Sequence, residues 1–123
     1  MKKWAALIAI ALCSQSGHAD DWNTADTWRE GGFQILNLID WGQTRNIARN
    51  PQRLREVQSA WLIGSHPSVE TVDTLMIASA ILHPLVSWAL PNGAWRNGWQ
   101  YVTIGGKFNA TVANASIGIK IDF

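Results

Sequence analysis

The sequence predicts a mainly α-helical fold with two long apolar helices, able to pair as a helical hairpin, followed by a C-terminal β-hairpin or strand. Two long apolar stretches begin with helix-start signals and end at proline or glycine. Near the C-terminus, apolar side chains alternate with polar ones, which is typical of strands. Of the 123 residues 47% are apolar and 15% charged, which favours one ordered small domain over a disordered chain.

Residues 1–19 resemble an export signal. Lys2 and Lys3 precede an apolar core at residues 4–12, and residues 17–19 form a small-residue cleavage site. Nine apolar residues are too few to cross a bilayer, which needs about 20, so we expect cleavage after Ala19 rather than an uncleaved anchor. Cleavage would remove Cys13 and leave residues 20–123 as a single small helical envelope domain without disulfides.

The first long helix is expected at residues 28–48. Thr27 and Glu30 match a capping box, and Asn50 before Pro51 is disfavoured in a helix. At 100° per residue, four polar side chains fall within one arc of about 120°. This polar stripe consists of Asn37, Asp40, Gln43 and Thr44. The stripe could bind a polar group or supply a base, or it could form a buried network between helices.

A basic loop follows, with half of the positive charges expected in the mature chain: Arg45, Arg49, Arg53 and Arg55. It is either a solvated connector or a loop that contacts lipid headgroups or faces the cytoplasm. A turn with Gly64, His66 and Pro67 then precedes the next helix, which Ser68 could start.

The second long helix is expected at residues 72–90. This run of nineteen residues is close to membrane-spanning length, but a buried core helix kinked at Pro84 would have the same composition. Trp61 and Trp88 flank the run, which favours a membrane interface.

The alternating pattern predicts strands at residues 101–112 and 116–123. The competing interpretation is a third helix at residues 95–109 with only the last eight residues extended. Alternation that ends at Phe123 is typical of the closing strand of outer-membrane barrels. Two strands cannot form a barrel within one chain, since at least eight are needed, so only an oligomeric barrel or a simple hairpin would be compatible.

The sequence offers no motif for catalysis. The spacings of zinc proteases, of nucleophile elbows and of phosphate-binding loops are absent, so neither an enzyme, a metal site nor a cofactor is expected. A formal charge of +1 gives no surface for nucleic acid.

Several short segments resemble a group of small exported proteins encoded by tailed phages and proteobacterial prophages. The resemblance covers about four fifths of the chain and implies a membrane or envelope context without a mechanism or site residues. It rests on Asp40-Trp41-Gly42-Gln43-Thr44, Ile47-Ala48, Gly64-Ser65-His66-Pro67-Ser68, Leu90-Pro91, Trp99-Gln100, Thr103-Ile104-Gly105 and Ser116-Ile117-Gly118-Ile119-Lys120. Related chains have Asn-Pro before the turn, where this chain has Ala60-Trp61-Leu62-Ile63.

The expected protein is therefore exported and membrane-associated, of phage or prophage origin, and acts through contacts with the envelope or another protein. The inner membrane or periplasm is the expected location, with the outer membrane as the alternative. If both long helices cross the membrane, the basic loop faces the cytoplasm. One alternative is a soluble periplasmic domain with a polar pocket of Asp40, His66 and His83. Another is a phage effector that alters the host envelope, by lysis or by exclusion of a second phage.

Overall fold

A computed structural model describes residues 21–123 of the chain, which form four helices. These are α2 (Thr24–Arg49), α3 (Ala60–Ile63), α4 (Val69–Ala89) and α5 (Ala94–Ser116). The expected export signal at residues 1–19 lies outside the described residues.

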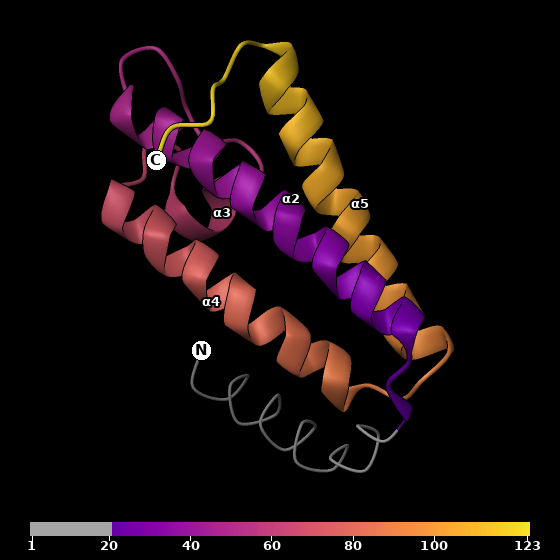
Figure 1. The fold of residues 1–123 in the computed structure, drawn as a ribbon. Helices are drawn as coiled ribbons and strands as arrows, with labels where there is room; N and C mark the ends of the chain where they lie inside the picture. The colour runs from indigo at the N-terminus through magenta and orange to yellow at the C-terminus, as the bar shows by residue number, and fades with distance from the viewer. Residues whose placement is uncertain (1–20) are drawn as a thin grey trace.

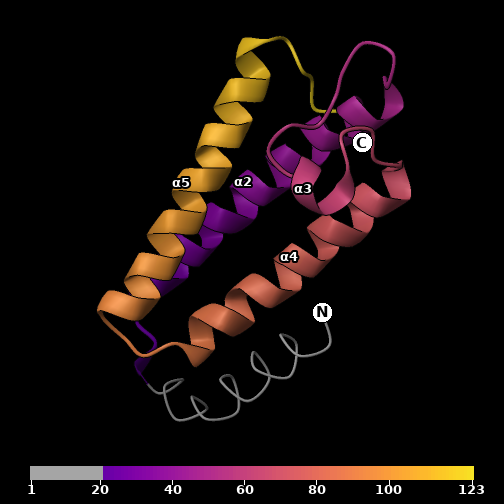
Figure 2. The ribbon, with the colours of Figure 1, turned by 180° about the vertical axis from the view of Figure 1, so that it is seen from behind.

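The three long helices form a bundle in which α4 runs antiparallel to α2 and α5, while α2 and α5 run parallel to each other (Figure 1). Helix α2 packs along both α4 and α5, whereas α4 and α5 contact each other much less (Figure 1). The beginnings of α2 and α5 meet the end of α4 at one end of the bundle. The connection at residues 50–68, which contains α3, folds back at the opposite end (Figure 2).

Helix α2 begins four residues earlier than the sequence analysis expected. Its N-cap is Asn23, whose side chain accepts a hydrogen bond from the Asp26 N–H, while the Asp26 carboxylate accepts one from the Asn23 N–H. This reciprocal pair is a complete capping box, so Thr27 lies inside the helix. The Thr27 hydroxyl instead accepts a hydrogen bond from the Trp22 indole.

Helix α4 continues through Pro84. Its N-cap is Ser68, as the sequence predicted, and the Ser68 side chain accepts a hydrogen bond from the Thr71 N–H. Because Pro84 has no N–H, the Ala80 carbonyl one turn earlier loses its helical donor. The Gln34 side chain on α2 donates to that carbonyl at 3.0 Å. A tertiary hydrogen bond therefore replaces the backbone bond that proline removes.

This replacement can be tested with two variants. We expect Gln34→Leu to lower the free energy of unfolding by about 1–3 kcal/mol, because a buried carbonyl would lose its donor. Adding Pro84→Ala should restore part of the loss, since residue 84 would then supply an N–H to Ala80. A double-mutant cycle of unfolding free energies measures the coupling. Additive effects of the two changes would contradict this account.

The predicted C-terminal β-hairpin is wrong: residues 94–116 form helix α5, and residues 21–123 contain no strand. The polar side chains of this segment recur every three or four residues as well as at alternate positions. The helical spacing is the one that places Arg96, Gln100 and Lys107 against acceptors on α2. The contacts of α5 with α2 therefore favour the helical spacing over the alternating one, a choice that the sequence alone left open.

The expectation of two long apolar helices is also wrong. Within the described part of the chain, α4 is the one helix that is long and apolar enough to cross a membrane by length and composition. Helix α2 carries charged side chains along its whole length, namely Asp26, Arg29, Glu30, Asp40, Arg45 and Arg49.

The C-terminal tail, residues 117–123, returns to α2. The Asp122 N–H donates to the Gly42 carbonyl at 3.0 Å, and Arg49 donates to the Asp122 carboxylate at 2.7 Å. The hydrogen bond from Arg49 lowers the pKa of the Asp122 carboxyl from its ordinary value. The Phe123 ring meets the Trp41 ring edge-on, with centroids 6.0 Å apart. The tail therefore extends over α2 and does not pair as a strand.

Gly42 is the position on α2 where the tail requires glycine. A Cβ there would lie 2.4 Å from the Ile121 side chain and 2.9 Å from the Phe123 ring. We expect Gly42→Ala to displace the tail, to cost about 1–3 kcal/mol of stability and to expose residues 117–123 to carboxypeptidase. Gly31→Ala is the matched control, because nothing lies within 4 Å of its Cβ, and it should stabilise α2 slightly. Equal protease resistance of the two variants would contradict this packing.

Candidate functional site

The interior of the bundle is unusually polar. Twelve polar or charged residues in the described part of the chain are buried, against seven apolar ones. Water-soluble bundles normally bury apolar side chains and expose charged ones. The twelve residues, called the polar interior below, are Asp26, Glu30, Asn37, Asp40, Gln43, Thr44, Glu56, His83, Ser87, Arg96, Gln100 and Thr111.

Helix α2 supplies the central row of this polar interior. Its buried side chains recur at alternating steps of four and three residues, the spacing of a packing seam between helices. That seam consists of Asp26, Glu30, Phe33, Asn37, Asp40, Thr44 and Ile47. Five of these seven side chains are polar, so α2 contacts its neighbours mainly through hydrogen bonds and ion pairs.

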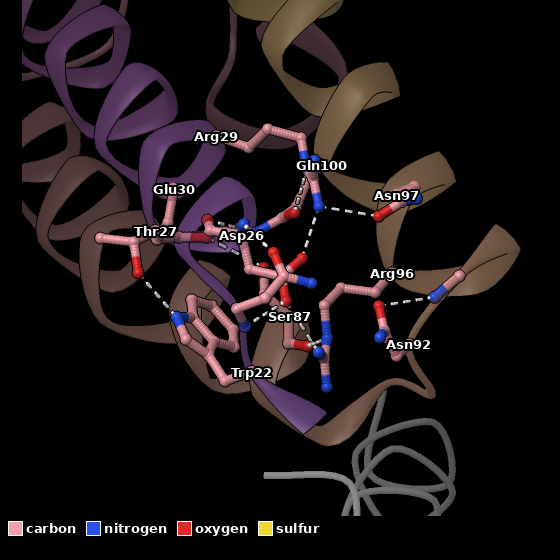
Figure 3. Close-up of polar contacts among 12 residues, drawn as sticks. Trp22, Asp26, Thr27, Arg29, Glu30, Ser87, Asn92, Arg96, Asn97 and Gln100 are labelled. Atoms are coloured by element: carbon pink, nitrogen blue, oxygen red, sulfur yellow. Dashed lines mark hydrogen bonds and ion pairs between the residues drawn. The ribbon is translucent and has the colours of Figure 1, made fainter. Parts of the chain in front are cut away.

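At the end of the bundle where α2 begins, Asp26 is the centre of a buried ionic cluster (Figure 3). Arg96 of α5 donates to the Asp26 carboxylate at 3.0 Å, and both side chains are fully buried. Arg29 also pairs with Asp26 and donates to the Gln100 side chain at 2.7 Å. The Arg96 guanidinium lies 5.2 Å from the centre of the Trp22 ring. The two arginines share one carboxylate and tie α2 to α5 at this end.

In the middle of the bundle, His83 of α4 connects all three long helices. Its Nδ1 lies 2.8 Å from the Glu30 carboxylate, and its Nε2 lies 2.7 Å from the Thr103 hydroxyl. The imidazole is stacked on the Phe33 ring, with centroids 3.5 Å apart, and on Trp99 at 5.0 Å. The order carboxylate, imidazole, hydroxyl is that of a catalytic triad.

In the half of the bundle beyond His83, Lys107 of α5 donates to the Asp40 carboxylate at 2.6 Å. Thr44, one turn along α2, lies 3.4 Å from the same carboxylate. The Gln43 side chain accepts a hydrogen bond from Asn114 at 3.3 Å and donates to the backbone of α5. Asp40 is therefore paired with an ammonium group.

Two cavities adjoin these contacts. An apolar one of about 360 Å³ lies between α4 and α5, and Leu82, Val86 and Trp99 are among its walls. A polar one of about 280 Å³ lies between α2, α5 and the connection that precedes α3. Both cavities reach Phe33 and Thr103, so they meet near the middle of the bundle.

The structure buries all four residues of the predicted polar stripe. Asn37 donates to the Met76 carbonyl on α4 at 3.1 Å, while Asp40 and Gln43 bond to α5. Thr44 is buried beside Asp40. The stripe thus faces both neighbouring helices rather than one ligand.

The three residues of the predicted pocket do not share a cavity in the described part of the chain. Asp40 lines the polar cavity and His83 the apolar one. His66 lies with residues 51–55 in a surface hollow at the far end of the bundle. In the turn beside it, Gly64 adopts a φ of 83° and Pro67 is buried.

The basic loop divides into paired and unpaired residues. Arg45 bonds to Asp73 of α4 at 3.0 Å, and Arg49 bonds to Asp122 of the tail. Arg53 and Arg55 are exposed and form no ion pair with any residue between 21 and 123. The unpaired arginines therefore lie at the end of the bundle opposite Trp28 and Trp95.

Sequence reasoning missed the polar residues that extend the interior beyond the stripe, above all Glu30, Arg96 and Gln100. The signal that could have found Glu30 is the alternating four-three spacing, which continues from Asp40 back to Asp26. No comparable signal identifies Arg96 and Gln100 as interior, because an arginine in an apparent strand region is normally taken as exposed.

No cluster of three metal-ligating side chains occurs in the part of the chain that the structure describes. Comparisons with protein-family models, curated proteins and solved structures found no match to this chain.

Proposed function

We propose that this protein is an exported protein of the cell envelope whose three long helices lie in a membrane, and that it acts through contacts with lipid or another envelope protein. The observation that carries the proposal is the inverted distribution of side chains, polar inside and apolar outside. In a bilayer the outside of a bundle meets hydrocarbon, while polar residues face the interior and pair with one another.

The outer faces of α2, α4 and α5 are apolar over the middle of the bundle. Every exposed charged side chain between residues 21 and 123 lies at an end of the bundle, in a connection or in the tail. Large apolar side chains with about half or more of their surface exposed include Ile35, Leu38, Ile77, Ile81, Leu82, Leu85, Val102, Phe108 and Val112. A water-soluble monomer rarely exposes so continuous an apolar surface.

The lengths of the helices match a bilayer. Helices of 26, 21 and 23 residues are about 39, 32 and 35 Å long at 1.5 Å per residue. The hydrocarbon core of a bilayer is about 30 Å thick.

Among the described helices, length and composition select only α4, because α2 carries six charged side chains and α5 carries two together with many glycine and polar residues. The charged side chains between the ends of these two helices point inward and are paired, so lipid would not contact them. They are Glu30, Asp40 and Lys107.

The exposed side chains at the two ends of the bundle differ, as they do on the two sides of a membrane. Trp28, Trp88 and Trp95 are exposed where α2 and α5 begin and α4 ends, which we call the tryptophan end. Arg53 and Arg55 are exposed at the opposite, arginine end, where Trp61 of α3 is also exposed. Tryptophan gathers at headgroup level, and arginine-rich loops stay in the cytoplasm. An exported N-terminus would then place the tryptophan end outside and the arginine end inside.

A role in contacts rather than catalysis agrees with the surroundings of Thr103. Its hydroxyl can donate to the Trp99 carbonyl at 2.8 Å, so it need not donate to His83. Because Thr103 lies in the middle of α5, the neighbouring N–H groups are used within the helix and cannot form an oxyanion hole. The His83 cluster therefore acts as a brace between helices. A phage or prophage origin remains a proposal that rests on the sequence resemblance.

Fractionation tests the proposal. We expect the expressed chain to remain with membranes after alkaline carbonate and to dissolve only in detergent. Mass spectrometry of the same material should find a mature chain that begins at Asp20. Release by carbonate without detergent would overturn the membrane proposal.

A further inference from the structure

We propose that the polar cavity between α2, α5 and residues 56–59 binds a small molecule that carries a primary ammonium group. The ligand is either a free amine or the ethanolamine headgroup of a lipid, which present the same chemistry. The cavity of about 280 Å³ is lined by charged and polar side chains on one side and by Phe33 and Ala110 on the other.

The charges that line this cavity do not balance. Asp40 and Lys107 form an ion pair at 2.6 Å, which cancels one carboxylate against one ammonium. Glu56 also lines the cavity, and only 6% of its surface is exposed. Among residues 21–123, no cationic side chain pairs with it. The Glu56 carboxylate in the lining of this cavity therefore lacks a cationic partner, and its second oxygen is accessible to a ligand.

The Glu56 side chain is held in place for binding. One of its carboxylate oxygens accepts a hydrogen bond from the Ser59 N–H at 2.9 Å, and its own N–H donates to the Ser65 carbonyl at 2.7 Å. The second carboxylate oxygen has no partner among the described residues. Because the backbone fixes Glu56 at the cavity, that oxygen is a preorganised acceptor for a positively charged donor.

An ammonium group fits this site better than a metal ion. Only two carboxylates line the cavity, and Lys107 already neutralises one of them. A divalent ion would require more oxygen ligands, and Lys107 would repel it more strongly than it repels a singly charged ammonium. An ammonium needs only two or three acceptors, which Glu56, Ser59 and Asn114 can supply. The Phe33 and Ala110 wall would contact a short carbon chain.

Binding of a free amine can be measured without any assumption about the membrane. The purified full-length protein in mild detergent is titrated with ethanolamine by calorimetry. We expect saturable binding, no binding of ethylene glycol, which lacks the charge, and no binding of choline, which lacks N–H donors.

Glu56→Gln should weaken ethanolamine binding about tenfold or more, the loss of one charge-assisted hydrogen bond. It should still fold, because the amide oxygen keeps the bond from Ser59, and its thermal unfolding checks this. Glu70→Gln is the control, because Glu70 is exposed on α4 and lies outside the cavity. Equal affinities of Glu56→Gln and the native chain, or no saturable binding of ethanolamine, would overturn the proposal.

A second comparison identifies the source of the ammonium. The same titration is repeated in lipid nanodiscs of phosphatidylcholine with or without phosphatidylethanolamine. If phosphatidylethanolamine competes with ethanolamine in the native chain but not in Glu56→Gln, the ligand is the lipid headgroup. If it does not compete and ethanolamine still binds, the site takes a free amine. A failure of this proposal would leave the carbonate result unchanged, so the two proposals fail separately.

Discussion

Replacing Arg96 by methionine should lower the free energy of unfolding by about 3–5 kcal/mol, the largest loss expected from a single substitution in this chain. Arg96 is fully buried, pairs with Asp26 and donates to the carbonyls of Ser87 and Leu90 at 2.8 and 2.9 Å. Methionine would fill much of the same volume but would leave Asp26 with one hydrogen-bonded arginine instead of two, and two carbonyls at the end of α4 would lose their donors. Arg29 would still pair with Asp26, so the loss should stop short of complete unfolding.

Denaturant unfolding in detergent micelles, followed by tryptophan fluorescence, measures this effect. Arg53→Met is the matched control, because Arg53 is exposed and should change stability by less than about 0.5 kcal/mol. A loss below about 1 kcal/mol for Arg96→Met would show that the ionic cluster contributes little to the fold.

The second large effect is expected at Ile81, in the middle of the outer face of α4. Its side chain is 57% exposed. On the surface of a water-soluble protein, Ile81→Lys would be nearly neutral. If that face meets lipid, a lysine there should cost about 2.5–3.5 kcal/mol of insertion free energy. We therefore expect the variant to fail to insert or to appear in the soluble fraction as an aggregate.

Gln52→Lys, in the exposed connection at the arginine end, adds the same charge outside the proposed membrane region and is the control. It should fractionate like the native chain. A folded, membrane-bound Ile81→Lys protein with native stability would contradict the assignment of this face to lipid.

The sequence predicted those parts of the fold that local signals determine. Ser68 caps α4, because its hydroxyl accepts a hydrogen bond from a free N–H of the first helical turn. Asn50 before Pro51 ends α2 as expected. The polar stripe on α2 was found because helical periodicity places Asn37, Asp40 and Thr44 on one side, and the structure buries them.

The sequence predictions were wrong or incomplete where contacts between distant segments determine the local structure. Residues 101–112 fit both a strand and a helix in isolation, and contacts with α2, such as the ion pair of Lys107 with Asp40, favour the helix. The accommodation of Pro84 within α4 could not be predicted either, because the donor to the Ala80 carbonyl comes from Gln34, 46 residues away. Glu56 could not be recognised as a ligand candidate, since its place at a cavity depends on how the connection folds back over α5.

The apolar character of α2 was overestimated for a related reason. The sequence analysis counted its apolar side chains, several of which, such as Ile35 and Leu38, are exposed, and it did not weigh the charges that face the interior. Mean hydropathy cannot distinguish a charge that faces a partner from one that faces lipid. The pattern of pairing in three dimensions makes that distinction.

The most direct test of the membrane proposal is a thiol-labelling map of three single-cysteine variants in a Cys13→Ser background. The positions are Asn92 at the tryptophan end, Leu85 on the outer face of α4 and Arg53 at the arginine end. With a membrane-impermeant maleimide on spheroplasts, we predict labelling of Asn92→Cys alone. Arg53→Cys should become reactive after the membrane is opened, and Leu85→Cys only after detergent is added. Equal labelling of all three positions on intact spheroplasts would contradict the proposal that this bundle lies in a membrane.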